Sequence, residues 1–263
     1  MNLPLYQIDA FSETLFSGNP ACVVPLTAWL PDSLLLNIAK ENAVAETAYF
    51  IHQHTNRFLL RWFTPEIEMD LCGHATLAAA HAIRTLLNLT DNTLVFETLS
   101  GDLKVTCDGS LYHLDFPSRK PSPSEIPASI SRALNIQPNE VLKSRDYVLV
   151  YETEQQILDI QINRMIFDEI NLDPGGVIVT AKGDECDFVS RYFTPQAYIL
   201  EDAVTGSAHC SLIPYWSERL KKTELNAMQL SERRGKLYCK NNGDRVIIGG
   251  KARTYSVGTI NLE

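Results

Sequence analysis

RWFTP at residues 61–65 recurs in this chain as RYFTP at residues 191–195. Two further matches follow in the same order with slowly growing offsets: GHA at 73–75 with GSA at 206–208, and SGDL at 100–103 with RGKL at 234–237. A repeat of this length indicates a duplicated domain rather than a stack of short repeats. The sequence therefore predicts two lobes of one design, an N-terminal lobe over 1–118 and a C-terminal lobe over 119–263, with the last strand able to return to the first lobe.

The segments around these matches predict a helix inside a sheet in each half. Residues 75–87 are apolar nearly all round, which is typical of a helix buried on all sides. Residues 207–220 are the counterpart, where Pro214 is expected to kink the helix or delay its start. Residues 119–146 are interpreted as a linker. We expect an α+β fold of two pseudo-symmetric lobes, each a curled β-barrel-like sheet around a central helix, with a ligand crevice between the lobes.

Composition excludes some classes of partner. Asp and Glu number 32 against 23 Lys and Arg, which gives a formal net charge of −9. Nucleic-acid binding normally requires clustered Lys and Arg, and the chain has no such run. Nucleic acid is therefore not an expected partner.

The sequence also predicts a compartment. The N-terminal stretch lacks the charged and apolar regions of a signal peptide, and no apolar run is long enough to cross a bilayer. The six cysteines are scattered without a CxxC pair, which indicates reduced, mostly buried thiols and no zinc site. We expect a cytoplasmic protein with no membrane partner and no metal.

Differences between the two halves indicate where the chemistry lies. Both repeated motifs are expected to end at a helix N-terminus, where free backbone N–H groups and the helix dipole favour a carboxylate. Alignment of the repeats places Gly176 opposite Glu46 and Ser207 opposite His74, while the second half adds Asp202. The fold therefore does not require a carboxylate at position 46. A Glu, a His and an Asp that converge on the crevice are suited to moving protons.

Several motifs occur in an order that is characteristic of one family. They are Ile8–Phe11, Gly18–Pro20, Glu46–Ala48, Phe63–Pro65, Gly73–Ala75, Glu201–Ser207 and the closing GGKA and VGTI segments. Together they resemble the PhzF-like (phenazine-biosynthesis-like) isomerases, which share the diaminopimelate epimerase fold, and the resemblance covers essentially the whole chain.

The resemblance implies a cofactor-independent isomerase that moves a proton between carbons of a small carboxylated substrate, in a protein that is commonly a homodimer. It implies that Glu46 abstracts the proton and returns it to another carbon. His74 and Asp202 would bind polar groups of the substrate and assist the transfer. The substrate-binding residues that it implies are Gly73, Gly206, Ser207 and Asn19.

Three other functions stay open. Epimerases of this fold use two cysteines, but the chain has Cys72 at the first position and Thr205 at the second, whose hydroxyl is far less acidic than a thiol. A serine hydrolase built on Ser207 with His209 or His74 would lack the GxSxG nucleophile elbow. A non-catalytic small-ligand-binding protein on the same fold would have no need of the complete proton-handling set.

Overall fold

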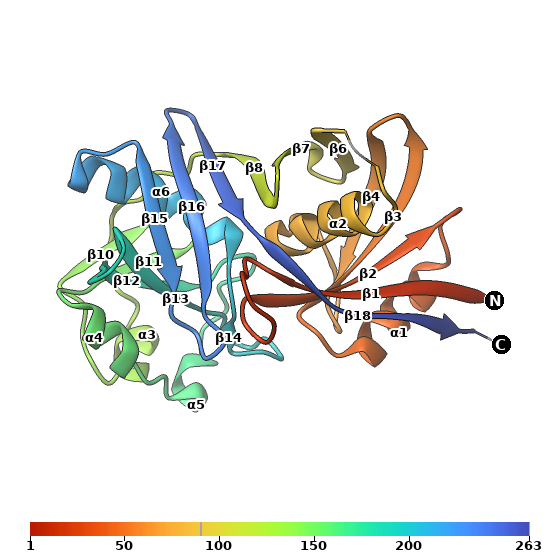
Figure 1. Cartoon of the computed structure of the whole chain (residues 1–263). Coiled ribbons are helices and arrows are strands. Elements are labelled where there is room, and N and C mark those ends of the chain that lie inside the picture. Colours follow the sequence, from red (N-terminus) through yellow and green to blue (C-terminus); the bar gives the residue numbers. More distant parts are fainter. Residues whose placement is uncertain (90, 263) are drawn as a thin grey trace. The chain divides into compact units, whose positions relative to one another are not determined.

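The computed structural model describes residues 1–89 and 91–262 and divides the chain into two compact units. The first unit comprises Met1–Asp115 and Ile248–Glu263, and the second comprises Phe116–Ile247. Each unit contains its own strands and its own long central helix (Figure 1). Within the described residues, no helix has the length and apolar character needed to span a membrane.

The first unit is built from strands, an outer helix and an inner helix. Its elements in chain order are β1 (Asn2–Ala10), β2 (Asn19–Leu26), α1 (Asp32–Asn42), β3 (Glu46–His54), β4 (Arg57–Phe63), β5 (Glu68–Met69), α2 (Gly73–Thr85), β6 (Thr93–Thr98), β7 (Gly101–Asp108), β8 (Leu111–Pro117) and β18 (Ala252–Asn261).

The second unit has the same plan with additional short helices. Its elements are β9 (Ser122–Pro123), α3 (Ala128–Ala133), β10 (Glu140–Lys143), β11 (Tyr147–Val150), α4 (Glu154–Asp159), α5 (Arg164–Phe167), β12 (Val177–Lys182), β13 (Phe188–Phe193), β14 (Glu201–Asp202), α6 (Gly206–Leu220), β15 (Glu224–Gln229), β16 (Gly235–Asn242) and β17 (Arg245–Gly250).

Strand pairing is repeated between the units. In the first unit β1–β2 is antiparallel, β2–β3 parallel, β3–β4 antiparallel, β4–β6 parallel and β6–β7 antiparallel. In the second unit β10–β11, β11–β12, β12–β13, β13–β15 and β15–β16 follow the same series of directions. The predicted fold class is confirmed, since each unit is a curled mixed sheet with a helix inserted between equivalent strands.

Helix α2 is buried as its composition predicts. Every residue from Gly73 to Ala80 is buried, and so are Ala82 and Ile83. The helix lies against β1, β2, β3 and β18, and its alanines allow this close approach because they carry only a methyl group. Burial of the helix on nearly all sides fixes its N-terminus firmly within the unit.

Helix α6 is the counterpart of α2 and packs on β15 and β16. It begins at Gly206 and runs through Pro214 to Leu220. Of the two expected effects of Pro214, a kink or a late start, the late start is wrong. Trp216 anchors the helix, because its indole N–H donates to the Thr180 hydroxyl at 2.9 Å and its ring stacks on Phe188.

The interpretation of residues 119–146 as a linker is wrong. This segment contains β9, α3 and β10, and β10 pairs along its length with β11. Ile130 of α3 belongs to an outer core that also contains Ile157 of α4, Phe167 of α5 and Val179 of β12. These short helices therefore cover one face of the sheet in the second unit, as α1 does in the first.

Candidate active site

Glu46 lies at the beginning of β3. Helix α1 ends at Asn42, and Ala43 takes a positive φ of 51°, which turns the chain toward the strand. Glu46 then pairs in parallel with Ala21 of β2 but lies one residue before Thr47, where pairing with β4 begins. Its carboxylate is thus held at a strand end, with only 14% of the side chain exposed.

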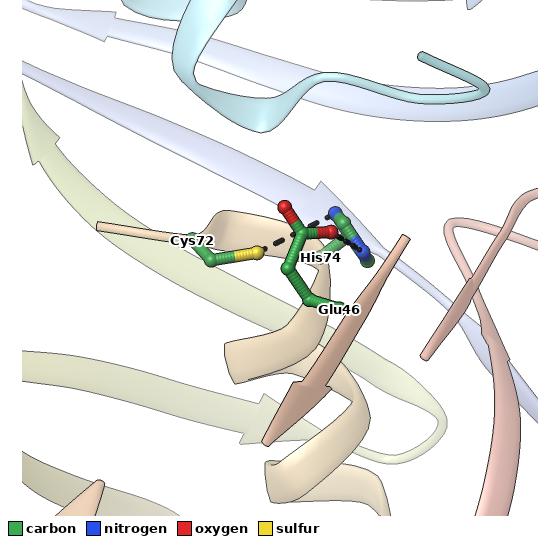
Figure 2. Close-up of side chains that lie close together, drawn as sticks. All are labelled: Glu46, Cys72 and His74. Atoms are coloured by element: carbon green, nitrogen blue, oxygen red, sulfur yellow. Dashed lines mark hydrogen bonds and ion pairs between the residues drawn. The ribbon is translucent and has the colours of Figure 1, made fainter. Parts of the chain in front are cut away.

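His74 is the second residue of α2 and contacts this carboxylate. Cys72 has an extended conformation just before the helix, which directs the following residues into the unit. The His74 side chain is 4% exposed, and its Nε2 lies 2.9 Å from Oε2 of Glu46 (Figure 2). Although the separation is that of an ion pair, neither atom makes an aligned hydrogen bond within the described residues. Both atoms therefore keep capacity for another polar partner.

The charges of this pair follow from its surroundings. Burial opposes the charged form of His74, but the neighbouring Cys72 and Glu46 outweigh burial and raise the pKa of His74 well above 6.5. Burial also raises the pKa of the Cys72 thiol, which therefore stays protonated. We accordingly attribute the stabilisation of the imidazolium to the Glu46 carboxylate. The neighbouring Glu46 carboxylate thus favours the imidazolium form of His74.

Glu46, Cys72 and His74 have ligand atoms within 4.8 Å of one another, which raises the question of a metal ion. The cluster offers only three ligands, and the Cys72 sulfur is 3.6 Å from Nδ1 of His74 while the Glu46 carboxylate is 2.9 Å from Nε2. Burial raises the pKa of the Cys72 thiol and so disfavours the thiolate, which is the form that binds a metal. The chemistry of the donor set therefore gives little support to a metal ion here.

Asn19 belongs to the same cluster. It is the first residue of β2 and is 1% exposed. Its amide Nδ2 lies 3.1 Å from Nδ1 of His74, whereas Glu46 contacts the other ring nitrogen, Nε2. Among the expected site residues of the first unit, the structure thus brings Glu46, His74 and Asn19 together, with Gly73 adjacent to His74 in the chain.

The remaining expected residues lie in the second unit. The hydroxyl of Thr205, the residue before α6, donates to Asp202 at 2.6 Å. Gly206 and Ser207 begin the helix, and the Ser207 hydroxyl accepts a hydrogen bond from Arg145 at 3.0 Å. The structure therefore groups these residues around the N-terminus of α6.

The predicted equivalence of Gly176 and Glu46 agrees with the strand register. In each unit this residue directly precedes the one that pairs with the Phe of the repeated motif. A Cβ at Gly176 would lie 2.6 Å from the ring of Tyr192 and 2.7 Å from the backbone carbonyl oxygen of Phe193, so no larger residue fits unless the backbone also moves. The second unit therefore has no room for a side chain at the position where the first unit carries Glu46.

Sequence analysis did not single out Arg145, Asp146 and Tyr192. Asp146 is 1% exposed and pairs with Arg145 at 3.1 Å. It also accepts from the Tyr192 hydroxyl at 3.1 Å and from the backbone N–H of Gly176 at 2.9 Å. These partners satisfy a buried charge, which is a structural role. The repeat itself contained a signal that could have directed attention to Tyr192, because a tyrosine hydroxyl stands there in place of Trp62.

The geometry argues against a serine hydrolase. His209 is fully buried, and its Nδ1 lies 2.9 Å from the Thr205 carbonyl one helical turn earlier. Burial lowers its pKa to about 4. The Ser207 hydroxyl contacts Arg145 rather than an imidazole. A guanidinium cannot accept the proton of a nucleophilic serine.

These features define a duplicated α+β protein with a carboxylate–imidazole pair at the start of one central helix. The chain belongs to the phenazine biosynthesis-like protein family, whose sequence profile matches residues 8–258. The predicted family resemblance is thereby confirmed.

Individual relatives agree with this assignment. An uncharacterized isomerase of Pseudomonas aeruginosa is 45% identical over 263 residues and 100% of both chains. The crystal structure of a PhzF-family phenazine biosynthesis protein from Enterococcus faecalis is similar with a TM-score of 0.94, at 44% identity over 100% of each chain. A hydroxyproline epimerase from Agrobacterium vitis has a TM-score of 0.62 at 10% identity, covering 98% of this chain and 92% of that chain, and shares the fold alone.

Proposed function

We propose that this protein is an isomerase that relocates a proton between carbons of a small carboxylated metabolite, with Glu46 as the general base and acid. The observation that carries the proposal is the buried pair of Glu46 and His74 at 2.9 Å, whose facing atoms lack aligned hydrogen bonds. Charged groups are rarely desolvated in this way without a function.

The reaction balances without an electron carrier. The Glu46 carboxylate takes a proton from one carbon, and the electron pair of that C–H bond is delocalised into a conjugated π-system of the substrate. The neutral Glu46 acid then returns the proton to another carbon of the same system. Because substrate and product have the same composition and oxidation state, the proposed reaction needs no cofactor.

His74 has two roles in this scheme. Its imidazolium pairs with the Glu46 carboxylate, and its Nε2–H can donate to Glu46 or to a substrate oxygen on which negative charge develops. The N-terminus of α2, at Gly73, adds backbone N–H groups and the positive end of the helix dipole. A carboxylated substrate matches this local positive potential.

In the second unit we propose that Asp202, Gly206 and Ser207 bind polar groups of the substrate. The N-terminus of α6 and the Ser207 hydroxyl support this role, because they offer donors of the kind that a carboxylate accepts. Arg145 donates to the Ser207 hydroxyl and so orients it, while the charge of Arg145 is paired with Asp146.

The related epimerase reaction with two thiols has less support. Burial raises the pKa of Cys72, and Thr205 stands at the equivalent place before α6 with its hydroxyl donating to Asp202. A protonated thiol and an alcohol are a weak base pair for removing a carbon-bound proton.

The proposal can be tested before the natural substrate is known. Purified protein is incubated in D₂O with a panel of small unsaturated carboxylates, cyclic and acyclic, and deuterium incorporation is followed by mass spectrometry. Reversible proton abstraction exchanges carbon-bound hydrogen even where the overall equilibrium favours the starting isomer. We expect exchange in at least one compound and an isomeric product, both reduced at least about 100-fold by Glu46→Gln.

A matched control is Glu41→Gln, which changes an exposed glutamate on α1. It should leave exchange unchanged. Binding of a panel compound without exchange, equally in the wild type and in Glu46→Gln, would instead favour the non-catalytic ligand-binding function. Inversion at a single carbon with no double-bond shift would favour an epimerase.

Two broader expectations remain predictions. We propose that the protein is a homodimer, which light scattering of the purified chain would show as twice the chain mass. We also propose a cytoplasmic location, which cell fractionation would test.

A further inference from the structure

The imidazole of His74 is held from both ends by different side chains. Nε2 lies 2.9 Å from the Glu46 carboxylate, which comes from β3. Nδ1 lies 3.1 Å from the amide of Asn19, which comes from β2, and 3.6 Å from the sulfur of Cys72, which precedes α2. Within residues 1–89 and 91–262, these three groups contact the ring nitrogens, and Glu46 and Cys72 are the titratable ones.

The backbone before β2 is built to place Asn19 there. Gly18 has a φ of +70°, and a Cβ at this position would lie 2.1 Å from the carbonyl oxygen of Ala10. Asn19 itself pairs with Ala10 across β1 and β2. A glycine is therefore required at position 18 for the turn that places the Asn19 amide beside the His74 ring.

Burial argues against direct contact of Asn19 with the substrate. The residue is 1% exposed, less than either His74 or Glu46. Its amide contacts Nδ1 of the ring, whereas Glu46 contacts Nε2. An effect of Asn19 on chemistry would therefore be exerted through His74.

An amide is suited to a ring nitrogen that changes its protonation. With Nδ2 toward the ring, the amide donates to the lone pair of an unprotonated Nδ1, which leaves the imidazole proton on Nε2. After a half-turn about its terminal bond, the carbonyl oxygen accepts from Nδ1–H of an imidazolium. The two orientations are nearly identical in shape, so either fits the same space. The thiol of Cys72 is a weak partner in comparison.

We propose that Asn19 is a positioning residue that keeps a proton on Nε2 of His74, the nitrogen nearest Glu46, in both charge states of the ring. In the neutral ring Asn19 donates to Nδ1, and in the imidazolium it accepts from Nδ1–H. The role deepens the proposed function, because His74 can then lose and regain its second proton at Nδ1 while the Nε2–H that faces the reaction stays in place.

The second unit holds the equivalent helix residue in a different way. Ser207 is also the second residue of its helix, and Arg145, from the residues just before β11, donates to its hydroxyl. A guanidinium can only donate, and it does not change its charge at accessible pH. In both units a residue at or just before the start of the neighbouring strand thus holds the second residue of the helix. The partner that can both donate and accept, Asn19, occurs beside His74, which titrates.

Nuclear magnetic resonance of the resting protein tests this role without a substrate. Protein labelled with ¹⁵N in histidine is titrated, and the ring nitrogen shifts report the protonated nitrogen directly. The signal of His74 is assigned by its loss in His74→Gln. In the wild type we expect the neutral form to carry its proton on Nε2. Asn19→Leu should reduce this preference about five- to tenfold, which is the effect of losing one buried hydrogen bond.

Further variants separate this role from a merely structural one. Asn19→Asp offers only acceptors at its charged carboxylate, so it should shift the proton of the neutral His74 ring to Nδ1 and raise the titration midpoint of His74. Asn19→Leu should instead lower this midpoint. Asn42→Leu is the control, since its amide donates to Thr47 at 3.0 Å beside Glu46. It should leave both readouts unchanged.

The results of these experiments separate the role of Asn19 from the proposed catalytic role of Glu46. Unchanged tautomer and midpoint in Asn19→Leu and Asn19→Asp would overturn the role of Asn19, even if Glu46 proves to be the catalytic base. If Asn19→Leu does not fold, Asn19→Asp alone decides, because a retained Nε2–H tautomer in that variant contradicts the proposal. Conversely, tautomer control could be observed in a protein that shows no proton exchange with any compound. Failure of the inference and failure of the proposed function are therefore distinguishable.

Discussion

The buried histidines respond to pH with opposite signs. Burial, aided for His81 by the charge of Arg253, lowers the pKa of His209 and of His81 to about 4 each, from 6.5. The unfolded chain therefore binds protons that the folded chain excludes, and stability falls as the pH decreases from about 6.5 to about 4. The raised pKa of His74 acts oppositely, since its contribution is full below 6.5 and is lost as the pH rises through the folded value.

The fully buried His209 permits a direct check. We expect the free energy of unfolding of the wild type to be lower at about pH 5 than at about pH 7, with a contribution from His209 on the order of 1–2 kcal/mol. His209→Gln, which keeps a donor near the Thr205 carbonyl, should remove that part of the slope in urea titrations. An unchanged slope would show that His209 does not stay neutral in the folded chain.

The sequence predicted which residues form the candidate site, but it did not predict which side chains hold them in place. The repeat shows that Glu46 and His74 lack counterparts, and this asymmetry is visible in the sequence. The contact of Asn19 with His74 depends on the strand order and on the turn at Gly18, which no local pattern encodes. For the same reason the partner of Ser207, Arg145, was not anticipated.

Among the elements, α6 shows how a helix tolerates a proline in its interior. Pro214 has no N–H, so the carbonyl of Cys210 one turn earlier loses its usual helix partner. That carbonyl accepts instead from the backbone N–H of Arg119 at 2.9 Å. The missing helix bond is thereby replaced by one that fastens the segment after β8 to the helix.

Pro214→Ala tests this exchange of partners. The alanine amide would compete with Arg119 for the Cys210 carbonyl, so we expect the amide of Arg119 to exchange with solvent several-fold faster, with a change in total stability of about 1 kcal/mol or less. Hydrogen exchange measured by mass spectrometry reports this segment. The amide of Trp216 in the same helix is the internal control, and faster exchange at both sites would indicate general loosening of α6 instead.

Long helices could be predicted from the sequence, whereas short ones could not. Residues 75–87 show a continuous apolar pattern, and α2 was found there with a start two residues earlier. Helices α3, α4 and α5 have six, six and four residues, which is too short for a helical period to be recognised. Their stability comes from packing on the outer face of β12, a tertiary effect that a local pattern does not contain.

At the scale of the whole molecule, the two ends of the chain belong to the same unit. β18 pairs antiparallel with β1 from Asn2 opposite Asn261 to Ala10 opposite Ala252, with a bulge between Gln7 and Ile8 (Figure 1). The first unit is therefore completed only by the last strand, whereas Phe116–Ile247 forms the second unit within one continuous stretch.

Truncation after Lys251 should accordingly affect the units unequally. Removal of β18 takes away the partner of β1 and uncovers part of α2, so we expect hydrogen exchange to become at least tenfold faster in β1 and α2. Strands β12 and β13 of the second unit should keep their protection. Equal loss of protection in both units would show that they unfold as one cooperative body.

The close packing around Gly176 has a consequence for redesign of the second half. A Cβ at this position would lie 2.6 Å from the Tyr192 ring and 2.7 Å from the backbone carbonyl oxygen of Phe193, so removal of the ring would still leave the carbonyl in the way. Removal of the Tyr192 hydroxyl would also take one hydrogen-bond donor from the buried Asp146. A carboxylate therefore cannot be transferred to Gly176 by side-chain replacement alone, because the backbone itself maintains the difference between the two halves.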